Sequence, residues 1–191
     1  HGDVEAIAEA AHSRGLSLHL DGARVWNASV ATGTPPATLC EPVDSVSACF
    51  SKGLGAPVGS VLAGDRDFIA RAHRYRKMLG GGMRQAGVLA GACLHALDHH
   101  VARLADDHDN ARALARALAV VDGIRCDPTQ VETNIVVFEV TTHKAPAFVG
   151  LAAERGVKLA ALDQTRVRAV THLDVSAADM QAAVRRLSTM S

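Results

Sequence analysis

The stretch Leu16-Ser17-Leu18-His19-Leu20-Asp21-Gly22-Ala23-Arg24 is the most informative part of this chain for its fold. Leucines alternate at positions 16, 18 and 20, which predicts a β-strand that ends at Asp21. A second apolar run, over residues 45–50, ends in the same way at Ser51-Lys52-Gly53. Strands that are followed by small residues and a polar side chain are typical of an open α/β sheet with its site beyond the strand ends. The sequence therefore predicts an α/β fold with Asp21 and Lys52 at one edge of a sheet.

The rest of the chain alternates between helical and extended patterns. Apolar spacing predicts helices over residues 3–14, 65–77, 146–155 and 177–187, and one long or two stacked helices over 84–120. Strands are predicted at 58–63, at 134–140 and within 157–170, and the segment carrying Gly33, Pro35 and Pro36 is predicted to be a loop. Asp122-Gly123 ends the long helical segment. We therefore expect a first domain over residues 1–122 and a smaller α+β domain over 123–191.

Composition narrows the class of protein. The 191 residues contain twenty Lys and Arg against twenty Asp and Glu, so the formal net charge is zero, which argues against a nucleic-acid binder. No apolar run approaches the ~20 residues that span a bilayer, so we expect no membrane segment. The four cysteines form no C-x-x-C pair, which predicts buried thiols in a reducing, cytoplasmic setting. With 48% hydrophobic but only 3% aromatic residues, the core is expected to consist mainly of Ala, Leu and Val.

Only four lysines are available as a catalytic amine, and Lys52 differs from the others in lying among small residues. A lysine can form a Schiff base with pyridoxal phosphate, and an aspartate opposite the ring nitrogen keeps that nitrogen protonated. About thirty residues separate Asp21 from Lys52, enough for a crossover that would bring both strand ends to one edge of the sheet. Taken singly, Lys52 could instead be a solvated loop residue and Asp21 a cap of the turn at Gly22.

Two other clusters of side chains have alternative readings. Arg71, Arg74, Arg76, Lys77 and Arg84 could form a polyanion patch, but the zero net charge and the lack of interleaved aromatic residues argue against nucleic acid. His95 and His99 are spaced as a helical pair that could bind a metal ion. Such pairs are more often solvated, and we expect no metal site.

Five motifs in order along nearly the whole chain resemble the low-specificity threonine aldolases. They are His19-Leu20-Asp21-Gly22-Ala23-Arg24, Ser51-Lys52-Gly53-Leu54-Gly55-Ala56-Pro57-Val58-Gly59-Ser60, Lys77 with Gly80-Gly81-Gly82-Met83-Arg84-Gln85-Ala86-Gly87, Thr133-Asn134-Ile135-Val136, and Arg168-Ala169-Val170-Thr171-His172. The resemblance implies an aminotransferase-like fold of type I, with part of the large domain followed by the small C-terminal domain. It also implies pyridoxal 5′-phosphate as the cofactor.

The resemblance assigns roles to individual residues. Lys52 would carry the cofactor as a Schiff base, and Asp21 would pair with its pyridinium nitrogen. Arg24 and Arg168 are similar to the arginines that hold the substrate carboxylate, for which a planar guanidinium is well suited. The amino-acid substrate would be threonine or allo-threonine, cleaved by a retro-aldol reaction to glycine and acetaldehyde.

Three further residues match the family at positions near the cofactor. Ser51 would donate a hydrogen bond to the phosphate, and Lys77 and Arg84 correspond to basic residues that a partner subunit can contribute, within a homodimer or homotetramer. Family members also have a longer N-terminal stretch with a phosphate-binding turn and ring-stacking histidines, so we expect this polypeptide alone to be almost or entirely inactive. Another fold-type I lyase of small amino acids and a noncatalytic chain remain alternatives.

Overall fold

The computed structural model describes residues 2–190, and these divide into two compact units. The N-terminal unit extends to Ala102 and the C-terminal unit begins at Arg103. The sequence placed the division later, after Asp122. The difference arises because the second half of the long helical segment packs on the C-terminal sheet, which periodicity alone does not indicate.

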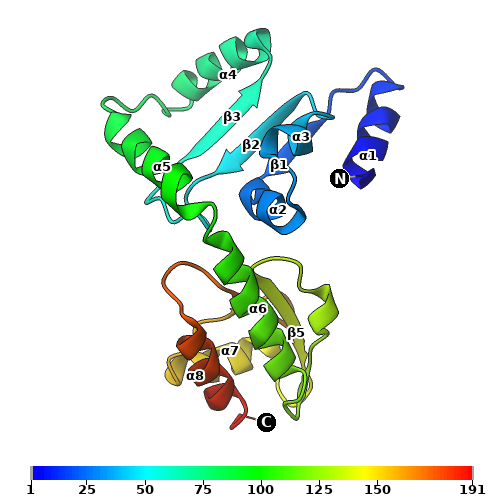
Figure 1. Cartoon of the computed structure of the whole chain (residues 1–191), viewed down its shortest axis with the longest axis vertical. Helices are drawn as coiled ribbons and strands as arrows, with labels where there is room; N and C mark the ends of the chain where they lie inside the picture. The colour runs from blue at the N-terminus through cyan, green and yellow to red at the C-terminus, as the bar shows by residue number, and fades with distance from the viewer. Residues whose placement is uncertain (1, 191) are drawn as a thin grey trace. The chain divides into compact units, whose positions relative to one another are not determined.

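The N-terminal unit contains five helices and three strands among its described residues (Figure 1). In chain order these are α1 (Gly2–His12), β1 (His19–Gly22), α2 (Val25–Thr32), α3 (Pro36–Cys40), β2 (Ser45–Cys49), β3 (Ser60–Gly64), α4 (Arg66–Met78) and α5 (Gly87–His100). The three predicted strands and the predicted helices that correspond to α1 and α4 are confirmed to within a few residues. The segment predicted as one or two helices over 84–120 is two helices, of which α5 is the first.

The order of the strands in this sheet is β1-β2-β3. β1 and β2 are parallel, with Asp21 opposite Ser47 and Gly22 opposite Ala48, whereas β3 is antiparallel to β2. Because β1 and β2 run in the same direction, their C-terminal ends lie at the same edge of the sheet (Figure 1). The residues after both strands are therefore neighbours in space, as the sequence predicts.

The prediction of a loop around Gly33 and the two prolines is wrong, because helices α2 and α3 occupy much of this segment. Gly33, at φ 67°, ends α2 in the left-handed conformation that glycine adopts at low cost, and Pro36 begins α3. Val25 and Leu39 from these helices pack with Ala48 of β2 as a small buried cluster. The glycine and prolines thus separate two short helices instead of marking a continuous loop.

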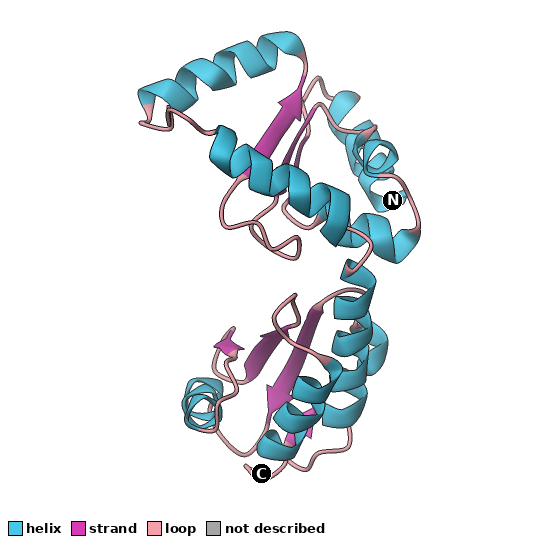
Figure 2. Cartoon of the chain, turned by 60° about the vertical axis from the view of Figure 1, so that its left-hand side comes forward, coloured by secondary structure: helices cyan, strands magenta, loops and turns pink. Residues whose placement is uncertain are grey.

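The C-terminal unit contains α6 (Leu104–Leu118), β4 (Ile124–Arg125), a 3₁₀ turn η1 (Pro128–Gln130), β5 (Ile135–Val140), α7 (Ala145–Glu154), β6 (Ala160–Ala161), β7 (Arg166–Val170) and α8 (Ala177–Leu187). Its antiparallel strands have the order β4-β5-β7-β6 (Figure 2). The strands predicted at 134–140 and within 157–170 and the helices at 146–155 and 177–187 are confirmed.

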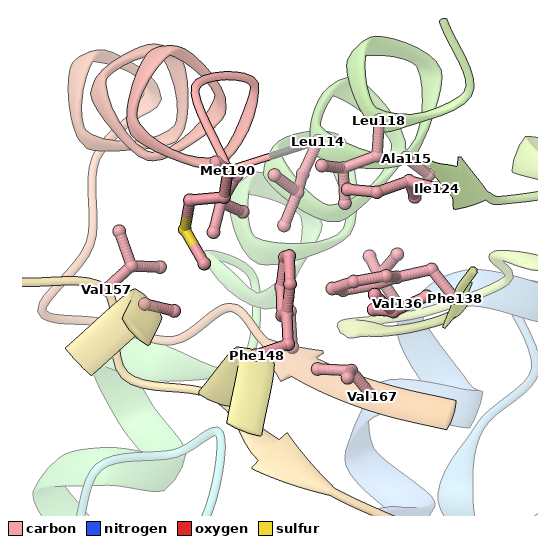
Figure 3. Packing of buried hydrophobic residues seen from close by; sticks show 14 of the residues in the cluster. Leu114, Ala115, Leu118, Ile124, Val136, Phe138, Phe148, Val157, Val167 and Met190 are labelled. Carbon is pink, nitrogen blue, oxygen red and sulfur yellow. The ribbon is translucent and has the colours of Figure 1, made fainter. Parts of the chain in front are cut away.

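Alternate residues of β5 and β7 face one shared core (Figure 3). Phe138 and Phe148 meet edge to face with ring centroids 6.1 Å apart, and Leu114, Leu118 and Val167 are almost fully buried around them. Val137, between two buried residues of β5, is 42% exposed. The helices α6, α7 and α8 therefore contribute to a core on one face of the sheet. The residues that alternate with the core residues along β5 and β7, including Arg168, lie on the other face.

The four cysteines, all within the described residues, are free thiols, but each is half-buried. The expectation that they are buried is therefore wrong, although the absence of pairing between them agrees with their irregular spacing. Within residues 2–190, no helix has the length and apolarity needed to cross a membrane.

Candidate active site

Asp21 lies at the C-terminal end of β1 with an exposed side chain. Its Oδ1 accepts a hydrogen bond from the Ala23 amide at 3.1 Å, which orients the carboxylate over the turn that follows the strand. Gly22 is buried, and a Cβ atom there would lie 2.8 Å from Val46 Cγ2 and 3.0 Å from the Ser47 carbonyl oxygen. The close approach of β1 to β2 beside Asp21 thus requires glycine.

Lys52 belongs to the connection between β2 and β3, which we call the lysine loop (residues 50–59). The Gly55 amide donates to the Lys52 carbonyl at 2.9 Å and the Ala56 amide donates to the Phe50 carbonyl at 3.0 Å. Gly55 has a φ of 70°, which allows this tight turn. The side chains of Ser51 and Lys52 are exposed, whereas Leu54, two residues further on, is 1% exposed. The loop therefore anchors an apolar residue and presents its lysine to solvent.

Arg24 follows Asp21 after two residues and stands at the N-terminus of α2, where it is half-buried. Its position is set by the turn between β1 and α2. The structure therefore brings Asp21 and Arg24 together at the edge of the sheet from which the lysine loop also leaves.

Lys77 and Arg84 line a second feature, a basic pocket of about 590 Å³. It is formed by the end of α4 and the loop before α5, and its ionisable lining residues are all basic: His73, Arg74, Arg76, Lys77 and Arg84. A Cβ atom at Gly82 would lie 2.9 Å from Lys77 Cδ, so the glycine leaves room for the lysine side chain. Lys77 and Arg84 thus share this pocket, and Asp21 and Lys52 are not among the residues that line it.

Arg168 belongs to the C-terminal unit, on β7 opposite Val137 of β5. The turn before β7 is held by Asp163, whose carboxylate accepts from the Thr165 amide at 2.9 Å and the Arg166 amide at 2.7 Å. These hydrogen bonds hold the pKa of the Asp163 carboxyl well below its usual range. Arg168 Nε is buried and makes no hydrogen bond within the described residues. A buried guanidinium N–H without a partner is costly, which suits a position that receives an anion.

The histidine pair predicted on the helical segment lies on α5. The rings of His95 and His99 are 4.4 Å apart, and both residues are exposed. Over residues 2–190, no group of three or more His, Cys, Asp or Glu side chains is placed to hold a metal ion.

Sequence reasoning missed one residue that contacts the lysine loop. His100, the last residue of α5, places Nδ1 2.6 Å from the Leu54 carbonyl oxygen. No signal in the sequence connects residues 54 and 100, because the contact depends on how α5 packs beside the sheet.

Solved structures define the class of fold. A putative L-allo-threonine aldolase from Listeria monocytogenes EGD-E superimposes with a TM-score of 0.79 over 98% of this chain and 56% of that chain, at 23% sequence identity. The parallel strand pair with its strand-end site and the separate antiparallel C-terminal unit thus belong to the aminotransferase-like α/β fold of type I, as predicted.

Residues 2–141 match the β-eliminating lyase family, and the chain belongs to that family. It is 44% identical over 183 residues to a probable low-specificity L-threonine aldolase 2 of Arabidopsis thaliana, covering 93% of this chain and 51% of that protein. It is 47% identical over 168 residues to a low specificity L-threonine aldolase of Escherichia coli O157:H7, covering 88% and 49% respectively. The chain spans about half the length of these curated relatives.

Proposed function

We propose that this chain is part of a pyridoxal 5′-phosphate-dependent aldehyde lyase that cleaves threonine and allo-threonine to glycine and acetaldehyde. The observation that carries the proposal is the parallel pairing of β1 and β2, which directs Asp21 and the lysine loop to one edge of the sheet. The similarity to low-specificity threonine aldolases supports the reaction and the substrate class. Because the chain spans half of those relatives, the activity is proposed for the whole protein.

The residues at the sheet edge fit the cofactor in kind. An exposed amine and an exposed carboxylate leave neighbouring parallel strands, and these are the two groups needed to hold the aldehyde carbon and the pyridinium nitrogen. When bound, pyridoxal phosphate supplies an electron sink for the pair released when the Cα–Cβ bond of the substrate breaks. Lys52 would bind the cofactor covalently through Nζ, and Asp21 would keep the proton on the ring nitrogen.

Two arginines would orient the substrate. Arg24, beside Asp21, and Arg168, with its buried Nε, are proposed to bind the substrate carboxylate. A carboxylate held by guanidinium groups fixes which bond at Cα stands perpendicular to the cofactor ring. Orientation of the Cα–Cβ bond would favour aldol cleavage over decarboxylation.

Ser51, Lys77 and Arg84 are proposed to lie near the cofactor, the last two through assembly of subunits. Ser51, exposed beside Lys52, would donate a hydrogen bond to the phosphate. Lys77 and Arg84 would approach the cofactor of a partner subunit in a homodimer or homotetramer, which agrees with their place in a basic pocket that neither Asp21 nor Lys52 lines. The four free thiols support a cytoplasmic location.

Reductive trapping tests the cofactor-binding part of this proposal without requiring turnover. The chain is incubated with pyridoxal phosphate, reduced with borohydride and digested, and the labelled lysine is identified by mass spectrometry. We expect the label on Lys52 and its loss in Lys52→Arg. Lys144 and Lys158, both exposed in the C-terminal unit, serve as internal references for nonspecific labelling. Equal labelling of all three lysines would refute a specific role for Lys52.

A second candidate function is β-elimination, since the family that the chain matches is described as β-eliminating lyase. The two lyases would share Lys52 and Asp21 but release different products. Retro-aldol cleavage of threonine yields glycine and an aldehyde, whereas β-elimination yields a 2-oxo acid and ammonia. Product analysis of the whole protein with threonine distinguishes them, and formation of the 2-oxo acid without glycine would overturn the aldolase assignment.

A further inference from the structure

We propose that His100 is a positioning residue for Lys52, an inference that rests on the proposed role of Lys52 as the cofactor-binding amine. His100 Nδ1 lies 2.6 Å from the Leu54 carbonyl oxygen. A carbonyl oxygen can only accept, so Nδ1 must carry the proton and donate it to this hydrogen bond. The tautomer of His100 is therefore fixed by the lysine loop itself.

The contact is placed where it controls the turn that carries the lysine. Leu54 is the residue between the turn at Lys52 and the left-handed Gly55, and its side chain is 1% exposed. The Lys52 carbonyl is already bonded to the Gly55 amide at 2.9 Å. Because His100 also holds the Leu54 carbonyl, the backbone is fixed on both sides of Gly53.

A second contact from the same helix fixes the other end of the loop. Cys93 Sγ lies 3.6 Å from the Val58 carbonyl oxygen, and a Cβ atom at Gly59 would lie 3.1 Å from that sulfur. Cys93 and His100 are seven residues apart, close to two helical turns, so they share one face of α5. Between them on this face, Ala96 is 1% exposed. α5 thus holds the lysine loop at two carbonyl groups, those of Leu54 and Val58.

The neighbouring histidines provide the matched control. The ring of His95 meets the ring of His100 edge to face with centroids 5.4 Å apart, which supports the orientation of His100. His99 is exposed and contacts the ring of His95 instead. A substitution at His99 therefore changes a histidine of the same helical turn and leaves the Leu54 hydrogen bond intact.

The proposal is tested with four variants and two measurements on the full chain. His100→Leu removes the donor, and His100→Asn restores an N–H near the position of Nδ1. His100→Gln places its N–H one bond further from the backbone, and His99→Leu is the control. Hydrogen exchange of the Gly55 and Ala56 amides measures the order of the loop, and borohydride trapping at Lys52 measures the position of the amine.

We expect exchange at Gly55 and Ala56 to be about two- to tenfold faster in His100→Leu, which is the effect of one lost hydrogen bond. Trapping at Lys52 should fall by a similar factor. His100→Asn should restore both values, His100→Gln less so, and His99→Leu should match the wild type. Amides of the C-terminal unit serve as a reference for folding, and if His100→Leu fails to fold, the comparison of His100→Asn with His100→Gln decides.

Unchanged exchange and trapping in His100→Leu would overturn the proposal, as would an equal effect of His99→Leu. Failure of His100→Asn to restore the loop would also overturn it, because the role would then belong to the imidazole ring and not to the donor. If wild-type Lys52 cannot be trapped at all, the proposed function fails, and the exchange measurements alone decide whether His100 orders the loop.

Discussion

The hydroxyl of Thr171 donates a hydrogen bond to the backbone carbonyl of Asp107, with 2.6 Å between the two oxygens. Both residues are almost fully buried, at 1% and 0% exposure. The Thr171 amide also donates to the Asn134 carbonyl at 3.0 Å, and Asn134 Nδ2 donates back to the Thr171 carbonyl at 2.8 Å. Thr171 thereby links the end of β7, the strand of Arg168, to both β5 and α6.

Replacing this hydroxyl should weaken the C-terminal unit. Thr171→Val keeps the shape of the side chain but removes the donor, and we expect the free energy of unfolding to fall by about 1 kcal/mol. Urea titration followed by circular dichroism measures this change. Thr189→Val is the control, since the exposed Thr189 hydroxyl donates to the Arg186 carbonyl at 2.9 Å; its effect should stay within about 0.5 kcal/mol. An equal loss of unfolding free energy in Thr171→Val and Thr189→Val would contradict the importance of burying the Thr171 hydroxyl.

Breaking the ion pair at the start of α6 should reduce the free energy of unfolding more than Thr171→Val does. Arg103 Nη2 lies 2.5 Å from Asp107 Oδ1, and the Asp107 side chain is 0% exposed. Arg103→Met would leave a buried carboxylate without its counter-charge, which should reduce the free energy of unfolding by about 3–5 kcal/mol.

Arg112→Met is a matched control for this prediction. Arg112 pairs with Asp109 on the same helix, also at 2.5 Å, but the Asp109 side chain is 73% exposed. An exposed pair contributes about 0–1 kcal/mol, so Arg112→Met should change stability little. Urea titrations of the two variants that gave the same loss would contradict the importance of burying Asp107.

His108 should make the C-terminal unit sensitive to mild acid. Burial lowers the pKa of His108 below its ordinary value, and the Arg112 charge acts in the same direction. The unfolded chain therefore binds the proton more readily than the folded chain, so stability is lost as the pH falls below about 6.5. In His108→Gln this loss should be absent. The free energy of unfolding of the variant, relative to that of the wild type, should therefore increase when the pH falls from about 7.5 to about 5.

Denaturant midpoints at both pH values measure this effect. His143→Gln, at an exposed histidine of the same unit, provides the control and should follow the wild type. A wild type whose midpoint responds to pH in parallel with His108→Gln would show that other groups cause the acid sensitivity.

Gly22 should be essential for placing Asp21 beside β2. In Gly22→Ala the new methyl would lie 3.0 Å from the Ser47 carbonyl oxygen, and this backbone atom can move only with its strand. We expect a loss of about 1–3 kcal/mol in the free energy of unfolding together with weaker trapping of pyridoxal phosphate at Lys52.

The control for Gly22 is Gly91→Ala, inside α5, where an added Cβ would meet nothing within 4 Å. Because alanine favours the helix over glycine, Gly91→Ala should be stabilising by roughly 0.5–1 kcal/mol. Thermal melts and trapping yields are measured for both variants. A tolerated Gly22→Ala would show that β1 and β2 can separate without disturbing the site.

Much of the local structure could be predicted because it depends on neighbours along the chain. Alternating leucines before Asp21 and apolar spacing in α1, α4 and α8 reflect periods of two and of 3.6 residues, which the sequence displays directly. Asp65 likewise caps α4, its carboxylate accepting from the Phe68 amide at 2.7 Å. The helices α2 and α3 were missed because Gly33 and the following prolines end one short helix and begin another, a pattern that also suits a loop.

The sequence by itself determined the family, through the ordered motifs around Asp21, Lys52, Lys77 and Arg168, together with the α/β fold class. Only the tertiary structure decided that α6 packs with the C-terminal sheet, that His100 holds the Leu54 carbonyl and that Thr171 holds the Asp107 carbonyl. Motifs and periodicity are properties of adjacent residues, which the order of amino acids records. These contacts join residues 46 and 64 positions apart, and they exist only once packing has brought distant segments together.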